Sequence, residues 1–259
     1  ERAALAGWRT AAFYAGYAAF FTVPLLPIFE TTAFTAATLA TISWVAICAL
    51  AITTILAAVA APAGEAHEHA QPGLGQTARS LWSNKPLRVY VAAIALPQVA
   101  SGMVGALYFF FMSNYLGIAD KVAFVALGTG LLGCLASMVW PFVMSCIGKH
   151  ATIAISTVST AATLVAMSSI QPGPHAYATM LIVFGLSSLT SAASMVGMSA
   201  IMADIVDYDE LRTRQSSAAV FYSLNTVIQK FGVTVGGSLA LILVGLFGFD
   251  PTAAANSAM

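Results

Sequence analysis

The chain has 259 residues, of which 59% are hydrophobic and only 8% are charged, and its formal net charge is zero. A soluble domain carries about a quarter charged residues and could not keep this much apolar side chain away from water. The composition therefore excludes an ordinary soluble domain and predicts an all-α integral membrane protein, and no basic patch indicates a nucleic-acid partner.

Charged residues divide the chain into apolar runs that are long enough to cross a bilayer, which takes a helix of about 20 residues. The run 150–203 holds two spans, because the segment Gln171 to Pro174 (QPGP) breaks it. We therefore predict seven transmembrane helices, near 9–28, 34–60, 88–113, 122–147, 151–170, 176–205 and 217–248.

Basic residues predict the orientation, because Lys and Arg collect in short cytoplasmic loops. If the amino end is cytoplasmic, only Lys121 lies outside, and eight basic residues lie inside: Arg2, Arg9, Arg79, Lys85, Arg88, Lys149, Arg212 and Arg214. We expect the amino end and the loop 61–87 in the cytoplasm and the carboxyl end outside.

The start of the chain predicts a fragment, because Glu1 is not an initiator methionine and no signal peptide precedes the first span. The odd number of spans also predicts partner helices elsewhere in the same polypeptide. We expect residues 62–87 to be a solvated linker between a unit at 1–61 and a second unit at 88–259. His67 and His69 lie on this linker, and we predict no metal site there.

The last apolar run contains a lysine, Lys230, with no other charge between Arg214 and Asp250. An ammonium near the bilayer centre costs about 2.5–3.5 kcal/mol, so such a residue usually faces a polar cavity. Other polar residues recur at every fourth position around it, with Asn225 and Gln229 alongside: Tyr222, Thr226, Thr234 and Ser238. Such residues also join helices in membranes, but the lysine favours a cavity-lining face. The predicted substrate-binding residues of this span are Tyr222, Thr226, Gln229 and Lys230.

In the first span, Arg9 begins a face that continues through Phe13, Gly16, Tyr17 and Phe20. A guanidinium beside aromatic rings suits a sugar or a carboxylate, because it combines forked donors with a stacking surface. An arginine near the membrane interface also serves as a snorkelling anchor. Arg9 and Tyr17 are therefore candidate substrate-binding residues, with anchoring as the alternative for Arg9.

Charges cluster where the sixth span ends. Asp204 and Asp207 share one helix face, and Asp209 and Glu210 lie close to Arg212 in the sequence. Carboxylates at a helix carboxyl terminus oppose the helix dipole and need cationic partners. Asp204 has no local cation, so we expect Lys149 to pair with it from another helix. The cluster is either an ordinary interfacial group or a cytoplasmic gate made of Lys149, Asp204, Asp207, Glu210 and Arg212.

Three segments carry a family resemblance: 203–213 (ADIVDYDELRT), 221–232 (FYSLNTVIQKFG) and 245–249 (GLFGF). They closely resemble the glycoside-pentoside-hexuronide cation symporters of the major facilitator superfamily, to which melibiose permease belongs. The spacing of the seven spans agrees throughout the chain. Two features depart from the family pattern. The loop after Thr213 has fewer charged residues than in the family, and Met195 stands where melibiose permease has a tryptophan near its sugar.

The resemblance implies that the chain holds helices five to eleven of a twelve-helix major facilitator fold, in a bacterial inner membrane. It implies a secondary active transporter, not an enzyme, that carries a sugar or glycoside with sodium or a proton by alternating access and needs no cofactor. Arg9 matches an arginine in the family's sugar site. Lys230 matches a lysine near the cation and sugar sites, which implies a role in cation coupling.

Two alternatives to sugar symport remain. The same fold could move a lipid-like or other solute, because a fold does not determine its substrate. A seven-helix retinal protein would use Lys230 as its Schiff-base lysine, but it needs an outside amino end and an acid in the third span. Residues 89–119 contain no Asp or Glu.

Overall fold

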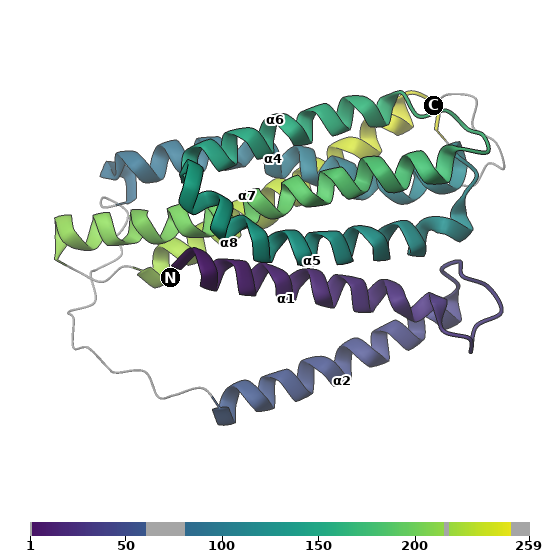
Figure 1. Ribbon diagram of the computed structural model, residues 1–259, viewed down its shortest axis with the longest axis horizontal. Helices are drawn as coiled ribbons and strands as arrows, with labels where there is room; N and C mark the ends of the chain where they lie inside the picture. The colour runs from purple at the N-terminus through teal and green to yellow at the C-terminus, as the bar shows by residue number, and fades with distance from the viewer. Residues whose placement is uncertain (1, 61–80, 215–217, 250–259) are drawn as a thin grey trace.

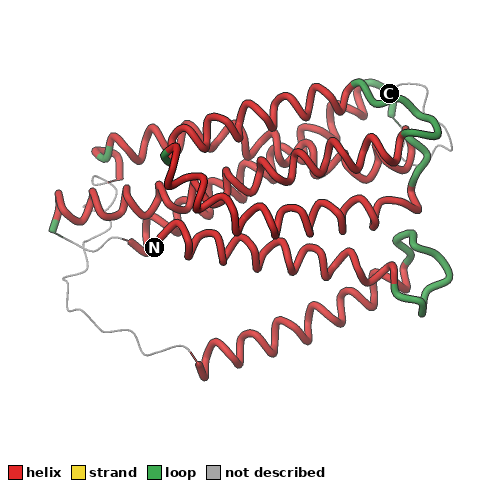
Figure 2. Tube along the Cα trace, in the orientation of Figure 1, coloured by secondary structure: helices red, strands yellow, loops and turns green. Residues whose placement is uncertain are grey.

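The computed structural model describes residues 2–60, 81–214 and 218–249, and these residues fold as a bundle of long helices (Figure 1). The long helices are α1 (Arg2–Thr22), α2 (Ala36–Ala60), α4 (Lys85–Phe110), α5 (Val122–Ile147), α6 (Lys149–Ser168), α7 (Ala176–Thr213) and α8 (Ala218–Leu246). Loops lie only at the ends of the bundle, and consecutive helices run in opposite directions (Figure 2). Six of the helices in the described part of the chain, all except α1, are long and apolar enough to cross a membrane. An all-helical membrane protein is thus confirmed, while seven spans and a twelve-helix parent fold stay predictions.

The first helix lies earlier in the chain than the expected span 9–28. α1 already begins at Arg2 and ends at Thr22, where a short 3-10 helix, Val23–Leu25, follows. The shift at the start has a local cause, because residues 2–8 are rich in Ala and Leu, which favour helix. The end is set by Pro24 and Pro27, since proline lacks the N–H that a continuing helix needs.

Two further helix boundaries differ from the expected spans. α4 begins at Lys85 rather than 88, because the Asn84 side chain accepts a hydrogen bond from the Leu87 N–H and caps the helix. α7 continues past 205 to Thr213 and has 38 residues. At 1.5 Å per residue it is about 57 Å long, well beyond a hydrocarbon core of about 30 Å. The charged end of α7 therefore extends past the apolar layer.

Helix packing divides the bundle into two groups that meet at α7. In the larger group α1 packs on α5 and α7, and α6 packs on α7; in the smaller group α4 packs on α8. The α4–α8 pair is very close, because a side chain at Gly236 would collide with the backbone carbonyl of Val99. Gly232 is buried against Gln98 in the same interface. Gly232 and Gly236 thus form a small-xxx-small pair that lets the two backbones approach closely.

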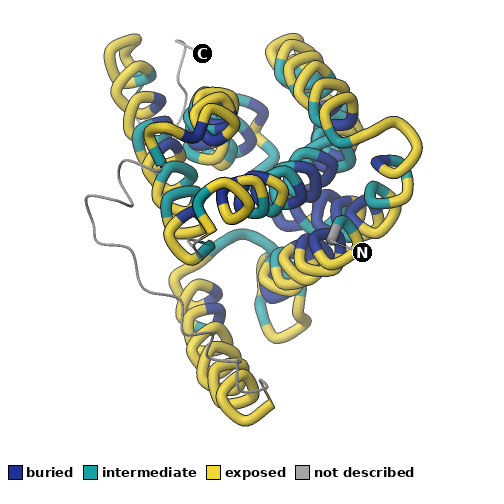
Figure 3. The backbone as a smooth tube through the Cα atoms, turned by 90° about the vertical axis from the view of Figure 1, so that its left-hand side faces the viewer, coloured by how far each residue is buried: buried dark blue, intermediate teal, exposed yellow. Residues whose placement is uncertain are grey.

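Hydrophobic clusters join the two groups at both ends of the bundle. One cluster includes Ile94 of α4, Ile205 of α7 and Phe221 of α8. Another packs Met112, which follows α4, against Val125 of α5 and Met180 of α7. α2 has only two buried residues, Thr38 and Ile42, and it stands exposed at the lower edge of Figure 3. Burial is thus concentrated on α5 and α7, whereas α4 and α8 bury few residues.

The end of the bundle where α4, α6 and α8 begin and α5 and α7 end is called the charged end below, because Lys149, Asp204 and Arg212 lie there. Most of the predicted linker, including His67 and His69, lies outside the described residues. Its last part is helical at 81–83 and enters α4 at Lys85. The division into units 1–61 and 88–259 stays a prediction. Within the described ranges, no group of three or more His, Cys, Asp or Glu residues could hold a metal ion.

Candidate functional site

The polar row of α8 points away from the partner helix α4. The residues of α8 that are buried are Phe221, Gly232, Gly236 and Ala240, whereas Tyr222, Thr226, Lys230, Thr234 and Ser238 are all exposed. The hydroxyls of the two threonines donate to backbone carbonyls one turn earlier, Thr226 to Tyr222 and Thr234 to Lys230, each at 2.9 Å. Their donors are satisfied within the helix, so these hydroxyls present acceptor lone pairs outward. None of the ion pairs among the described residues includes Lys230.

Beside this row, two side-chain amides are linked to a tyrosine of α4. The Tyr90 hydroxyl donates to Asn225 Oδ1 at 3.0 Å, and Gln229 Nε2 donates to the same oxygen at 3.1 Å. Asn225 and Gln229 are half-buried, while Tyr90 is buried. Sequence reasoning named Gln229 as a site residue but missed Tyr90, because nothing local to Tyr90 indicates which helix it faces.

The structure divides the predicted face of α1. Its packed side comprises Ala6, Thr10, Tyr14 and Ala18, and Tyr14 lies so close to α5 that a side chain at Gly133 would collide with its ring. Arg9 and Phe13 lie on the exposed side, whereas Tyr17 is half-buried against Gly130 of α5. Arg9 and Tyr17 are about 80° apart around α1, so Tyr17 lies at the edge of the exposed side that is nearest α5. Arg9 and Lys230 also belong to different packing groups. The helix of Arg9, α1, packs on α5 and α7, whereas the helix of Lys230, α8, packs on α4.

The expected partner of Asp204 is present at the charged end. Lys149 Nζ lies 2.5 Å from Asp204 Oδ2, and this pair joins the first turn of α6 to α7. The two side chains are 34% and 50% exposed, respectively, so the pair contributes at most about 1 kcal/mol. Both residues lie within 88–259, so the pair connects neighbouring helices of one predicted unit. Asp207 is half-buried and Glu210 is exposed on the same end of α7.

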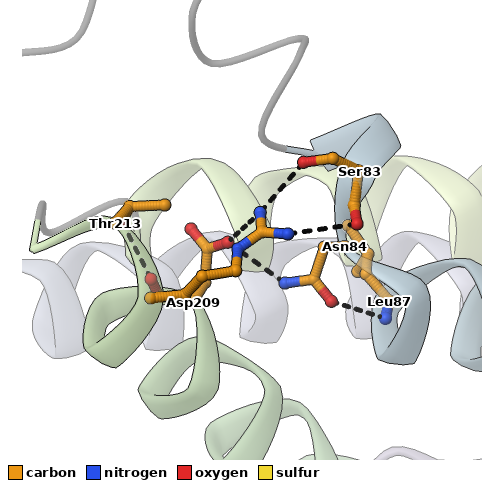
Figure 4. Close-up of polar contacts among 6 residues, drawn as sticks. Ser83, Asn84, Leu87, Asp209 and Thr213 are labelled. Atoms are coloured by element: carbon orange, nitrogen blue, oxygen red, sulfur yellow. Dashed lines mark hydrogen bonds and ion pairs between the residues drawn. The ribbon is translucent and has the colours of Figure 1, made fainter.

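Arg212 takes part in a second polar group, which we call the α7–α4 clamp and which consists of Ser83, Asn84, Asp209 and Arg212. Asp209 is 1% exposed, and its Oδ1 accepts hydrogen bonds from Asn84 Nδ2 and Arg212 Nη2, each at 3.2 Å. Figure 4 shows the Asp209 carboxylate beside the Asn84 amide, with a dashed line for the hydrogen bond between them. Arg212 also donates to the backbone carbonyl of Ser83 at 3.1 Å and to its hydroxyl at 3.0 Å.

The clamp fastens the end of α7 to the start of α4 through two buried polar residues, Asp209 and Asn84, and two exposed ones, Arg212 and Ser83. Asn84 does two tasks, because its Nδ2 binds Asp209 while its Oδ1 caps α4 by accepting from the Leu87 N–H at 3.0 Å. The expected local pairing of Asp209 with Arg212 is confirmed. The burial of Asp209 and the role of Asn84 were missed, although Asn followed by Lys85-Pro86 is a helix-start signal in the sequence.

Comparison with known proteins decides the family. A family model described as MFS/sugar transport protein matches residues 1–259. The chain belongs to this family. An uncharacterized symporter of Bacillus subtilis strain 168, YjmB, is 25% identical over 184 residues, which are 70% of this chain and 39% of the relative. The chain thus matches about two fifths of the relative's length.

Family membership confirms the resemblance that residues 203–213 and 221–232 carry. The family consists of membrane transporters of the major facilitator superfamily, and membership in it excludes the retinal-protein alternative for Lys230. The exposed polar row on α8 and the exposed Arg9 face are the parts of the described chain whose chemistry suits a polar solute.

Proposed function

We propose that the protein is a secondary active transporter that carries a sugar or glycoside together with sodium or a proton by alternating access. The observation that supports this best is the exposed polar row of α8, centred on Lys230, on a helix that is otherwise apolar and packed tightly on α4. In a bilayer such a row is stable only where it faces a polar cavity or another polar helix face. Within a sugar-transport family, a solute cavity is the use that fits this row.

The two cationic side chains suit different tasks in that cavity. The Lys230 ammonium is a compact point charge whose energy responds strongly to nearby carboxylates and cations in a low-dielectric site. We therefore assign it to the coupling of solute and cation, in which each ligand binds better when the other is bound. Arg9 offers a planar fork of donors, which suits paired hydroxyls or a uronate carboxylate. Tyr222, Thr226 and Gln229 supply hydroxyl and amide contacts from α8, and Tyr17 supplies one from α1.

The charged end supplies a weak gate in this proposal. The amino end lies in the cytoplasm of a bacterial cell, so the charged end lies on the cytoplasmic side of the inner membrane. The Lys149–Asp204 pair is half-exposed and therefore breaks at small cost. Asp204, Asp207 and Glu210 form an acidic surface at the end of α7, which meets the other half of the transporter when the cytoplasmic side is closed. Arg212 is held in the α7–α4 clamp and keeps α7 in place.

The test compares Lys230→Ala with Arg9→Lys in the protein expressed from its whole gene. Calorimetry measures the affinity for methyl galactoside, xylose and glucuronate at several sodium and proton concentrations. We expect Lys230→Ala to change the cation dependence of binding. Arg9→Lys should weaken solute binding and leave the cation dependence intact, because the forked donors are lost while the charge is kept.

A matched control is Lys121→Ala, which removes a half-exposed lysine paired with Asp120 at the opposite end of the bundle. This variant should leave both affinity and cation dependence unchanged. Unchanged solute affinity in Arg9→Lys, together with unchanged cation dependence in Lys230→Ala, would reduce both residues to membrane anchors and refute the site.

A further inference from the structure

We propose that Tyr90 is a positioning residue, which acts through Asn225 to fix the orientation of the Gln229 amide toward the solute. This inference rests on the proposed function, because it assumes that α8 lines the solute cavity. Tyr90 itself lies on α4 and has no place in the exposed polar row. Its effect on the solute is therefore indirect, and the chain of contacts that carries it has two hydrogen bonds.

The first link is rigid because the Tyr90 ring is buried. Tyr90 is 6% exposed and belongs to the cluster of Leu87, Ile94 and Phe221, which packs α4 against α7 and α8 at the charged end. A ring packed in this way has little rotational freedom, so its hydroxyl stays at one place beside α8. The 3.0 Å hydrogen bond to Asn225 Oδ1 therefore fixes which end of the Asn225 amide faces α4.

The second link follows from counting donors and acceptors. An amide oxygen has two lone pairs, and Asn225 Oδ1 uses both, one for Tyr90 and one for Gln229 Nε2 at 3.1 Å. The Asn225 Nδ2 donors must then point away from Tyr90. Gln229 has committed one of its two N–H groups, so it presents the other N–H and its carbonyl oxygen. Both amides are held in one orientation by a single oxygen.

This arrangement suits a solute with neighbouring hydroxyls. Gln229 adjoins Lys230 and lies one turn beyond Thr226, so its amide lies at the edge of the polar row. A fixed amide that offers one donor and one acceptor binds a pair of hydroxyls, each of which both donates and accepts. Without the Tyr90 hydroxyl, the Asn225 amide is free to turn over. The Gln229 amide would then lose its fixed partner and discriminate poorly between a hydroxyl and a hydrogen at the same solute position.

The experiment uses the protein expressed from its whole gene and the panel member of methyl galactoside, xylose and glucuronate that it binds most tightly. Tyr90→Phe removes only the hydroxyl and keeps the buried ring. We expect the dissociation constant to rise about two- to tenfold, as for the loss of one hydrogen bond. The maximal uptake rate and the unfolding temperature should stay near those of the parent protein. Preference for the solute over its monodeoxy analogues should shrink.

A double-mutant cycle separates positioning from general packing. In the Gln229→Ala background, Tyr90→Phe should cause no further loss of affinity, because its effect passes through the missing amide. Asn225→Leu should have the same effect as Tyr90→Phe and serves as a second variant. Tyr177→Phe, at the start of α7 and thus at the opposite end of the bundle, is the control for removing a tyrosine hydroxyl.

The outcomes distinguish the two proposals. If Gln229→Ala weakens binding but Tyr90→Phe and Asn225→Leu do not, the positioning role is wrong and the solute site stands. An affinity loss in Tyr90→Phe that persists in the Gln229→Ala background also overturns the positioning role. If Gln229→Ala and Lys230→Ala both leave binding unchanged, the solute site on α8 is itself wrong.

Discussion

Removal of the Asp209 side chain should destabilise the protein strongly, because this carboxylate is the centre of the α7–α4 clamp. Asp209→Ala deletes the acceptor of two hydrogen bonds, from Asn84 Nδ2 and Arg212 Nη2. It leaves the completely buried Asn84 amide without that acceptor. The contact of Thr213 with the backbone carbonyl of Asp209 survives, since it does not use the side chain.

The magnitude follows from the burial of the partners. Breaking a buried pair by removing one partner typically costs about 3–5 kcal/mol. Arg212 is 32% exposed and keeps two hydrogen bonds to Ser83, which reduces the cost to roughly 2–4 kcal/mol. For a chain of this size, each kcal/mol lost from the free energy of unfolding lowers the unfolding temperature by about 2–4 °C, so that temperature should fall by roughly 4–16 °C.

Thermal unfolding in detergent micelles, followed by tryptophan fluorescence, measures this change. Glu210→Ala is the matched control, because it removes an exposed carboxylate from the next position of α7 and should change stability by less than about 0.5 kcal/mol. Asn84→Ala loses the helix cap as well as the Asp209 contact, and its effect should not add to that of Asp209→Ala. Equal unfolding temperatures for Asp209→Ala and Glu210→Ala would refute the clamp.

Three further predictions concern packing, the gate and topology. Gly236→Ala should destabilise the α4–α8 pair, because the added Cβ collides with the Val99 carbonyl. Gly237→Ala should be tolerated, since the nearest atom to its added Cβ, the Gly102 carbonyl oxygen, lies at 3.6 Å. Equal unfolding temperatures for the two variants would contradict this contact. Lys149→Ala should barely change stability but should raise the accessibility of the charged end to a thiol reagent in single-cysteine variants, and unchanged labelling would remove the gate assignment. A reporter inserted within 61–80 should be cytoplasmic and one placed after 250 should be external; the reverse pattern would invert the proposed orientation.

The polar row of α8 could be predicted from the sequence because its information is local. A lysine in an apolar run, with polar residues at every fourth position, indicates one helix face whatever surrounds the helix. The same segment carries the family resemblance that the family match confirms. The pairing of Lys149 with Asp204 was predictable by elimination, since no cation lies one turn from Asp204.

The clamp and the Tyr90 contact could not be predicted because they depend on the packing of distant segments. Asn84 and Asp209 are 125 residues apart, and Tyr90 and Asn225 are 135 apart. Single-sequence periodicity gives each helix a polar and an apolar side, but it does not say which helices adjoin. The contact of Tyr17 with Gly130 of α5 could not be predicted for the same reason, because the sequence does not say which helix lies at the edge of the Arg9 face.

Solute uptake tests the central proposal most directly. The protein expressed from its whole gene is reconstituted into vesicles with an imposed sodium or proton gradient, and uptake of labelled methyl galactoside, xylose, glucuronate and an amphipathic lysolipid is measured. We predict that one of the three sugars accumulates above its external concentration only while the cation gradient lasts. Lys230→Ala should abolish this gradient-driven accumulation. Accumulation of the lysolipid alone, or sugar accumulation that is independent of both the sodium and the proton gradient, would contradict sugar–cation symport.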